Sequence, residues 1–190
     1  TWQLRDFSLN KYKNVDDKPY GGGAGMVLQV KPIRDCIAEI KNTTPKTKIA
    51  YLSPQGRRLD QDLVDELIKF ESLTLLCGRY EGVDERIIEN DIDLEISIGD
   101  YVISGGELAA MVVIDAVSRN LPGVVGNESS LQDSFKDGLL DHPHYTRPEV
   151  IDGQVVPEVL LSGHQAKIDE WRIKESLKKT KEKRPDLDKK

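Results

Sequence analysis

Three short apolar runs, each followed by a loop that contains glycine, constrain the fold of this chain more than any other feature. They cover residues 48–53, 73–77 and 93–103, and Gly99 interrupts the last one. Runs of this length between turn signals are typical of buried β-strands. Strands that alternate with helices indicate an α/β domain with a parallel sheet. Apolar periodicity predicts such helices over residues 32–40, 60–70, 84–89 and 107–120.

The loops after these runs predict a shared binding site. In an open α/β sheet, ligands bind outside the carboxyl ends of the strands, and here the loops cover residues 53–56, 77–82 and 98–106. Their glycines let backbone groups approach a flat ligand such as adenine, although glycines that merely end strands are the alternative. The run Pro54-Gln55-Gly56 indicates a turn that ends the first strand.

The fingerprints of several common enzyme classes are absent. Residues 21–25 are rich in glycine but lack the Rossmann spacing, and no Walker, GxSxG or HExxH pattern occurs. Two cysteines exclude a disulfide framework and fit a cytoplasmic, reducing environment. The presence of only three histidines disfavours histidine-rich metal chemistry. No apolar run approaches the roughly 20 residues that span a bilayer.

Charge is distributed unevenly along the chain. The whole chain carries −6, but residues 164–190 hold ten basic and six acidic side chains, so they carry +4 and the first 163 residues carry −10. A basic tail on an acidic body is a candidate polyanion contact, and a solvated surface helix is the alternative. Helical periodicity begins at Ala166 and follows a proline-rich stretch, residues 143–157, for which extended chain is expected.

Seven distinctive strings occur in order along almost the whole chain. They are VDDKPYGGG (15–23), LSPQG (52–56), CGRYEGVDER (77–86), SIGDY (97–101), SGGEL (104–108), DSF (133–135) and YTRPE (145–149). Together they resemble the bacterial tRNA (guanine-N1)-methyltransferase family, a member of the SPOUT class. The resemblance is specific because it rests on all seven strings together and in order.

The resemblance implies a fold and a division into domains. We expect a parallel α/β sheet with a deep trefoil knot over residues 1–125, a flexible linker over 126–138, and a small, mostly helical tRNA-binding domain over 139–190. The family also has a first strand and helix upstream, and we expect this chain to lack them. The knot is formed by the three glycine-bearing loops and holds S-adenosylmethionine in a bent conformation.

The resemblance also assigns a cofactor site and two catalytic residues. Methylation of guanine N1 requires loss of the N1 proton and leaves negative charge on O6. The family implies Asp133 as the general base and Arg119 as the partner of O6. Without the resemblance, Asp133 would be read as an ordinary loop carboxylate and Arg119 as a cation that complements the C-terminal end of its helix. The residues expected around S-adenosylmethionine are Tyr51, Leu52, Ser53, Pro54, Gly78, Tyr80, Glu81, Gly82, Ser97, Ile98, Gly99, Tyr101, Ile103, Gly105 and Gly106.

The expected substrate is tRNA, methylated at the guanosine just 3′ of the anticodon. Asp16 and Arg79 are candidates for holding that guanine, and basic residues of the second half are candidates for phosphate contacts. The family implies a homodimer with the active site at the subunit interface, and it allows a divalent ion such as magnesium, for which no ligand spacing is recognisable. A catalytically silent SPOUT-type RNA-binding protein and a phosphoryl transferase are the alternatives. The candidate phosphate contacts are Arg147, Lys167, Arg172, Lys174, Lys178 and Lys179.

Overall fold

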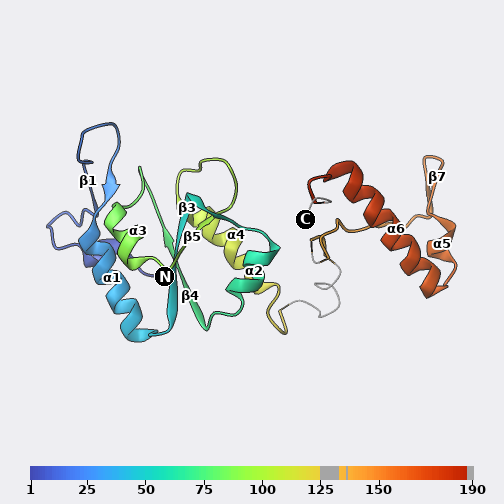
Figure 1. Ribbon diagram of the computed structural model, residues 1–190, viewed down its shortest axis with the longest axis horizontal. Helices are drawn as coiled ribbons and strands as arrows, with labels where there is room; N and C mark the ends of the chain where they lie inside the picture. The colour runs from blue at the N-terminus through green and yellow to red at the C-terminus, as the bar shows by residue number, and fades with distance from the viewer. Residues whose placement is uncertain (125–132, 136, 188–190) are drawn as a thin grey trace. The chain divides into compact units, whose positions relative to one another are not determined.

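The structure is a computed structural model that describes residues 1–124, 133–135 and 137–187. Its chain forms two compact units, Thr1–Val124 and Val125–Lys190, which are described separately below (Figure 1). Most of the linker expected over residues 126–138 lies outside the described residues.

A parallel three-stranded sheet forms the centre of the first unit. Strand β3 (Thr47–Arg58) lies between β4 (Ser72–Cys77) and β5 (Leu94–Ser97), and both neighbours run parallel to it. The predicted α/β class with a parallel sheet is therefore confirmed. Because the three strands point the same way, their carboxyl ends meet at one edge of the sheet.

Two strand boundaries differ from the predictions. The turn predicted at residues 54–56 is wrong, because β3 continues to Arg58 and pairs again with β5 beyond a register shift between Leu52 and Arg57. Gly56 makes this possible: a side chain there would overlap the backbone of Glu95. The third strand ends at Ser97, so residues 98–103 form a loop instead of the predicted strand continuation.

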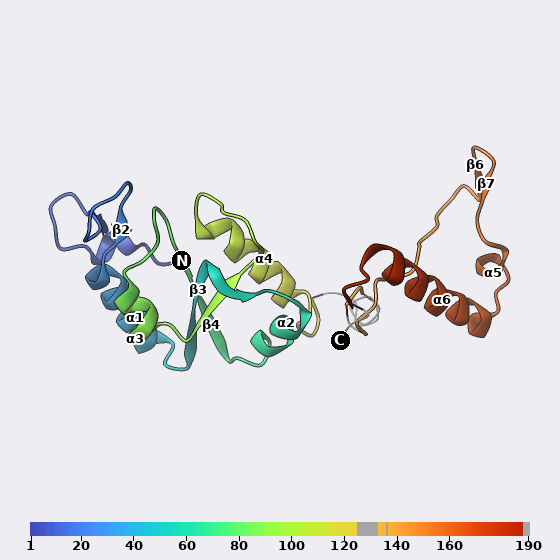
Figure 2. The same cartoon turned by 45° about the horizontal axis from the view of Figure 1, so that its top comes forward.

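Helices cover both faces of this sheet (Figure 2). Alternate residues of β3 point to opposite faces, so Ile49 and Tyr51 pack in one core while Ala50 and Leu52 pack in the other. Helices α1 (Val30–Thr43) and α3 (Glu85–Asp91) contribute to the first core. Helices α2 (Gln61–Leu67) and α4 (Gly106–Ser118) contribute to the second. The four predicted helices of this unit are thus present, with ends shifted by a few residues.

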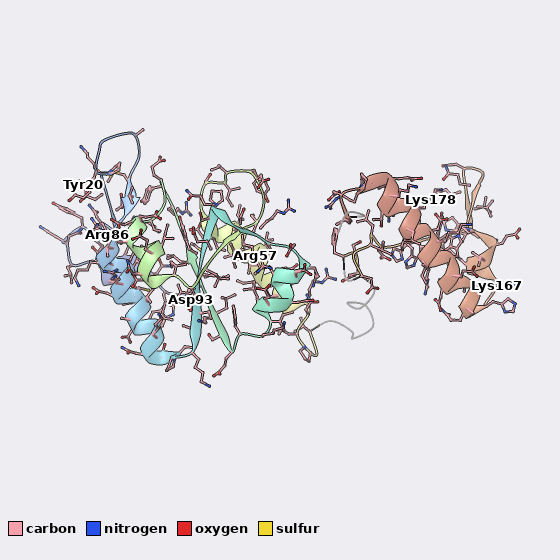
Figure 3. The ribbon with its side chains drawn as sticks, viewed as in Figure 1. Tyr20, Arg57, Arg86, Asp93, Lys167 and Lys178 are labelled. Atoms are coloured by element: carbon pink, nitrogen blue, oxygen red, sulfur yellow. The ribbon has the colours of Figure 1, made fainter. Side chains whose placement is uncertain are left out.

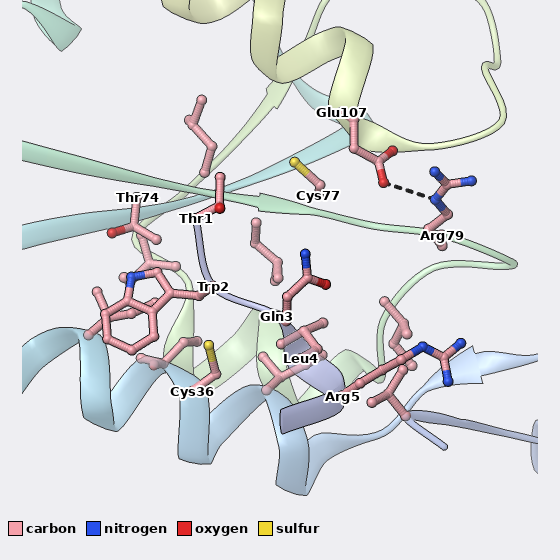
Figure 4. Close-up of a pocket in the computed structure, with 18 of the residues that line it drawn as sticks. Thr1, Trp2, Gln3, Leu4, Arg5, Cys36, Thr74, Cys77, Arg79 and Glu107 are labelled. Carbon is pink, nitrogen blue, oxygen red and sulfur yellow. Dashed lines mark hydrogen bonds and ion pairs between the residues drawn. The ribbon is translucent and has the colours of Figure 1, made fainter. Parts of the chain in front are cut away.

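The first residues of the chain lie beside the sheet rather than in it. A short 3₁₀-helix (Leu4–Phe7) precedes a hairpin of two-residue strands, β1 (Asp16–Asp17) and β2 (Val27–Leu28). A groove of about 790 Å³ runs between residues 1–5, α1 and β4 (Figure 4). Apolar side chains of α1 and β4 dominate its walls.

The second unit contains a hairpin and two helices. Strands β6 (Val150–Ile151) and β7 (Gln154–Val155) pair antiparallel, and α5 (Glu158–Leu161) leads into α6 (Gln165–Lys183). The long helix predicted from Ala166 is confirmed. No helix among the described residues of either unit is long and apolar enough to cross a membrane.

Candidate functional site

A cavity of about 220 Å³ lies at the carboxyl edge of the sheet. Its wall consists of the middle of β3, the loop after β4, and the loop between β5 and α4. Every residue expected around a cofactor lies on this wall, although the binding role itself stays a prediction. These residues are Tyr51, Leu52, Ser53, Pro54, Gly78, Tyr80, Glu81, Gly82, Ser97, Ile98, Gly99, Tyr101, Ile103, Gly105 and Gly106.

Close backbone contact holds two of these loops together. The N–H of Gly106, the first residue of α4, donates a hydrogen bond of 2.9 Å to the carbonyl of Gly78. A Cβ atom at Gly106 would lie only 2.8 Å from Cα of Cys77. Glycine is therefore required here by packing, and it brings the N-terminus of α4 directly to the end of β4.

Tyr51 lines the cavity and packs closely against two of its glycines. A Cβ atom at Gly78 would lie 2.9 Å from its ring, and one at Gly82 would lie 3.3 Å from its hydroxyl. Burial raises the pKa of Tyr51, and the nearby Glu95 raises it further, so the phenol stays neutral. Gly82 has φ +118°, a conformation that L side chains rarely adopt, and it lets the loop turn above this ring.

An ion pair joins Arg79 of the cavity wall to Glu107 of the apolar groove. The Nε of Arg79 donates to Oε1 of Glu107 at 2.9 Å, and both side chains are about half exposed (Figure 4). Arg79 lines both the cavity and the apolar groove, whereas Glu107 lines only the groove. Burial and the charge of Glu107 raise the pKa of the adjacent Cys77, so this thiol is not a thiolate nucleophile. No sequence pattern singles out Glu107.

The glycine-rich segment after β1 is attached to the same loop. The N–H of Glu81 donates to the carbonyl of Met26 at 2.9 Å, and the N–H of Leu28 donates to the carbonyl of Gly82 at 2.9 Å. Tyr20, at the tip of this segment, is fully exposed (Figure 3). Asp16 lies in β1 and is not part of the cavity wall.

Neither predicted catalytic residue is among those that line this cavity. Arg119 caps the C-terminus of α4, ten residues after Ala109, the last residue of this helix on the cavity wall, so a rise of 1.5 Å per residue places it about 15 Å along the helix from that wall. Asp133 belongs to the second unit. It lines a separate cavity of about 220 Å³ there, together with Asp137 and Arg172.

The segment around Asp133 is fastened within the second unit. The hydroxyl of Ser134 accepts a hydrogen bond of 2.9 Å from the N–H of Asp141. The hydroxyl of Thr180, buried on α6, accepts one of 2.8 Å from the N–H of Leu140. Helix α6 therefore supports the chain that follows the predicted base.

Most predicted phosphate contacts are exposed. Arg147 lies in the loop before β6, and Lys174 lies on α6, from which Lys167 and Lys178 also project (Figure 3). Arg172 is only partly exposed, and its guanidinium pairs with Asp169 at 3.3 Å. Lys179 is also partly exposed, and its ammonium donates to the carbonyl of Asp141 at 2.9 Å.

Comparison with known proteins gives consistent results. The family described as tRNA (guanine-1)-methyltransferase TrmD matches residues 1–190. A tRNA (guanine-N(1)-)-methyltransferase of Vibrio vulnificus strain YJ016 is 58% identical over 189 residues, which are 98% of this chain and 76% of that protein. The proteins of the same name from Shewanella sediminis and Glaesserella parasuis are 59% and 57% identical over 98% of this chain, which covers 78% and 75% of them. The chain therefore belongs to the tRNA (guanine-1)-methyltransferase family and is a methyltransferase.

Proposed function

We propose that this protein transfers a methyl group from S-adenosylmethionine to N1 of the guanosine just 3′ of the anticodon in tRNA. The observation that carries the proposal is the convergence of the middle of β3 and two glycine-bearing loops on one cavity in a chain of this family. The names of the relatives specify tRNA and guanine N1. The position of the guanosine follows from the family resemblance.

The cavity suits S-adenosylmethionine by its chemistry. Its glycines leave backbone N–H and C=O groups accessible, and Tyr51 and Ile98 offer apolar surface for an adenine. Glu81 provides a carboxylate on the same wall, suited to a ribose hydroxyl or a cation. When bound, the cofactor supplies an electrophilic methyl group on a sulfonium.

Asp133 and Arg119 perform the remaining chemistry in this proposal. The carboxylate of Asp133 accepts the N1 proton, since N1 carries a proton at neutral pH and its lone pair is delocalised into the ring. Loss of the proton frees the in-plane electron pair that attacks the methyl group. A positioned general base contributes about 10²–10⁴ in rate. The guanidinium of Arg119 stabilises the negative charge that develops on O6, a role in which one lost donor costs about 10²–10³.

A homodimer belongs to the proposal because of the geometry of α4. Arg119 lies about 15 Å along this helix from the cavity wall of its own chain, so in this proposal a second copy packed on α4 brings its Arg119 to the site. The outer face of α4 supports such packing, because it exposes large apolar side chains that a monomer has no reason to present. They are Leu108, Met111, Val112 and Ile114.

The trefoil knot and the RNA-binding role of the second unit are parts of the same proposal. The middle of β3 and the loops after β4 and β5 line one cavity, and a Gly106–Gly78 backbone hydrogen bond joins the two loops. A knot in this region requires close packing of this kind. In the second unit, the exposed cations of Arg147 and Lys174 are suited to tRNA phosphates.

Transfer of tritiated methyl groups to unmodified tRNA tests the proposal. Wild-type protein should methylate tRNA with guanosine after the anticodon and leave tRNA with adenosine there unmodified. Asp133→Asn should lower single-turnover rates by about 10²–10⁴. Asp137→Asn is the matched control, since this carboxylate lines the same cavity but has no assigned role, and its rate should stay within about threefold of the wild type.

The outcomes separate the alternatives. Wild-type protein that binds tRNA and S-adenosylmethionine without methylation would refute the proposal and favour the silent RNA-binding protein. Equal activity of Asp133→Asn and wild type would remove only the assigned base.

A further inference from the structure

Two of the three histidines of this chain converge on one carboxylate in the second unit. Nδ1 of His142 lies 2.6 Å from Oδ1 of Asp141, and Nε2 of His144 lies 2.7 Å from Oδ2 of the same residue. The potential ligand atoms of these three residues all lie within 4.8 Å of one another. Bonds of about 2.0–2.2 Å in a tetrahedral site place the ligand atoms about 3.4 Å apart, so shifts of about 1 Å, which open the two contacts to Asp141, complete the set.

The surroundings hold this group in place before any ligand arrives. The ring of His142 packs edge-on against Trp171 with the ring centroids 6.4 Å apart, and its side chain is only 11% exposed. The backbone of Asp141 is held at both ends, because its N–H donates to Ser134 and its carbonyl accepts from Lys179. His144 is 70% exposed, so ion and solvent can reach the group from its side.

The donor set selects the kind of ion. Two imidazole nitrogens and one carboxylate oxygen suit zinc, cobalt or nickel, whereas magnesium prefers oxygen ligands only. A charged carboxylate between two imidazoles is the arrangement that binds such an ion with coordination positions left for water.

We propose that Asp141, His142 and His144 form a binding site for a divalent transition-metal ion, with zinc as the expected occupant. None of the three residues lines the cofactor cavity. Asp141 is hydrogen-bonded to Ser134, the residue that follows Asp133. An ion bound there fixes residues 141–144 against α6. The alternative is that His142 and His144 only hydrogen-bond to Asp141 and that the group binds no metal ion.

Titration of the metal-free full chain with cobalt and zinc tests this proposal. Cobalt reports its ligands through visible d–d absorption, and zinc affinity is measured by competition with a chromophoric chelator. Wild-type protein should bind one ion per chain, with no displacement by excess magnesium. His144→Gln should weaken zinc binding by at least about tenfold, and because His144 is exposed its substitution should leave the melting temperature of the metal-free protein unchanged.

His164→Gln is the matched control. His164 is the third histidine, it is exposed at the N-cap of α6, and it is not part of the group. The proposal predicts wild-type affinity for this variant and a zinc-dependent rise in melting temperature that His144→Gln loses. Equal affinity of wild type and His144→Gln would overturn it, as would equal weakening by His164→Gln. Intense near-ultraviolet cobalt–thiolate bands would also overturn it, since they would assign the ion to Cys36 or Cys77.

Discussion

Gly106→Ala is expected to damage both the stability and the cofactor cavity of the first unit. The added Cβ would lie 2.8 Å from Cα of Cys77, 3.0 Å from N of Gly78 and 3.2 Å from C of Cys77. All three are backbone atoms at the end of β4, so no side chain can rotate out of the way. Ordinary contact begins at 3.4 Å, which means that the start of α4 must retreat by about 0.6 Å.

The size of the effect follows from two opposing terms. Overpacking of this kind costs about 1–3 kcal/mol, and the better helix propensity of alanine returns up to about 1 kcal/mol. The net loss of about 1–2 kcal/mol should lower the melting temperature by roughly 3–10 °C. The affinity for S-adenosylmethionine should fall at least about tenfold, because Gly78 and Gly106 line the cavity and sub-ångström misplacement is costly there.

Calorimetric titration and thermal melts of Gly105→Ala provide the control. At Gly105 an added Cβ meets only the ends of the flexible Glu107 and Arg79 side chains, and φ of −175° suits any residue. The ion pair between them is worth about 0–1 kcal/mol at this exposure, so Gly105→Ala should stay within about 1 kcal/mol of wild type. The packing argument fails if Gly106→Ala melts and binds like wild type, or if Gly105→Ala does equal damage.

Three further predictions concern other parts of the first unit. Asp60→Ala removes the side chain that accepts a backbone N–H at 2.9 Å at the start of α2, so urea denaturation should show a loss of about 1 kcal/mol, and a change below 0.3 kcal/mol would contradict the capping role. Burial raises the pKa of Asp93, but the N–H of Ile49 and the ammonium of Lys48 lower it more. The stability that Asp93 contributes is therefore present above about pH 4, its unfolded-state pKa, and is lost as pH falls further. Asp93→Asn should be less stable than wild type at pH 7. A difference in the free energy of unfolding that does not narrow towards pH 2 would refute this. Met111→Arg places a charge on the exposed apolar face of α4 and should shift sedimentation from dimer to monomer, whereas an unchanged dimer would exclude this face as the interface.

The sheet was predictable because its strands are buried on both faces. Residues 49–52 form a continuous apolar run, and that pattern survives in any tertiary context that covers both faces. The chain at residues 54–56 was not predictable, since β3 resumes its pairing with β5 just beyond them, where Arg57 and Arg58 pair with residues 39 positions later in the sequence. Residues 101–103 have high strand propensity, but they have no partner strand, and Val102 is exposed.

The site was predictable in its position and less so in its details. Parallel strands alone place the loops after β4 and β5 at one edge of the sheet, beside the middle of β3, and the family strings then name the residues on the cavity wall. The role of Glu107 was not predictable because its ion-pair partner, Arg79, lies 28 residues away in the sequence. The grouping of His142 and His144 was not predicted because two histidines are too few to stand out in the composition. The run Asp141-His142-Pro143-His144 nevertheless places three potential metal ligands within four residues.

Helix α4 connects the parts of the proposed site more closely than any other element. Its first residue packs on the backbone of β4 at the cavity, its inner face packs Ala109, Ala110 and Val113 in the core, and its C-cap is Arg119. Because its inner face is fixed by the core and its N-terminus by the cavity, the helix cannot rotate or slide to bring its own Arg119 to that cavity. In the proposed mechanism, Arg119 therefore acts at the cavity of another copy. The proposal then explains the exposed apolar face of α4 as the dimer interface, and it predicts that loss of the dimer abolishes methyl transfer while binding of S-adenosylmethionine persists.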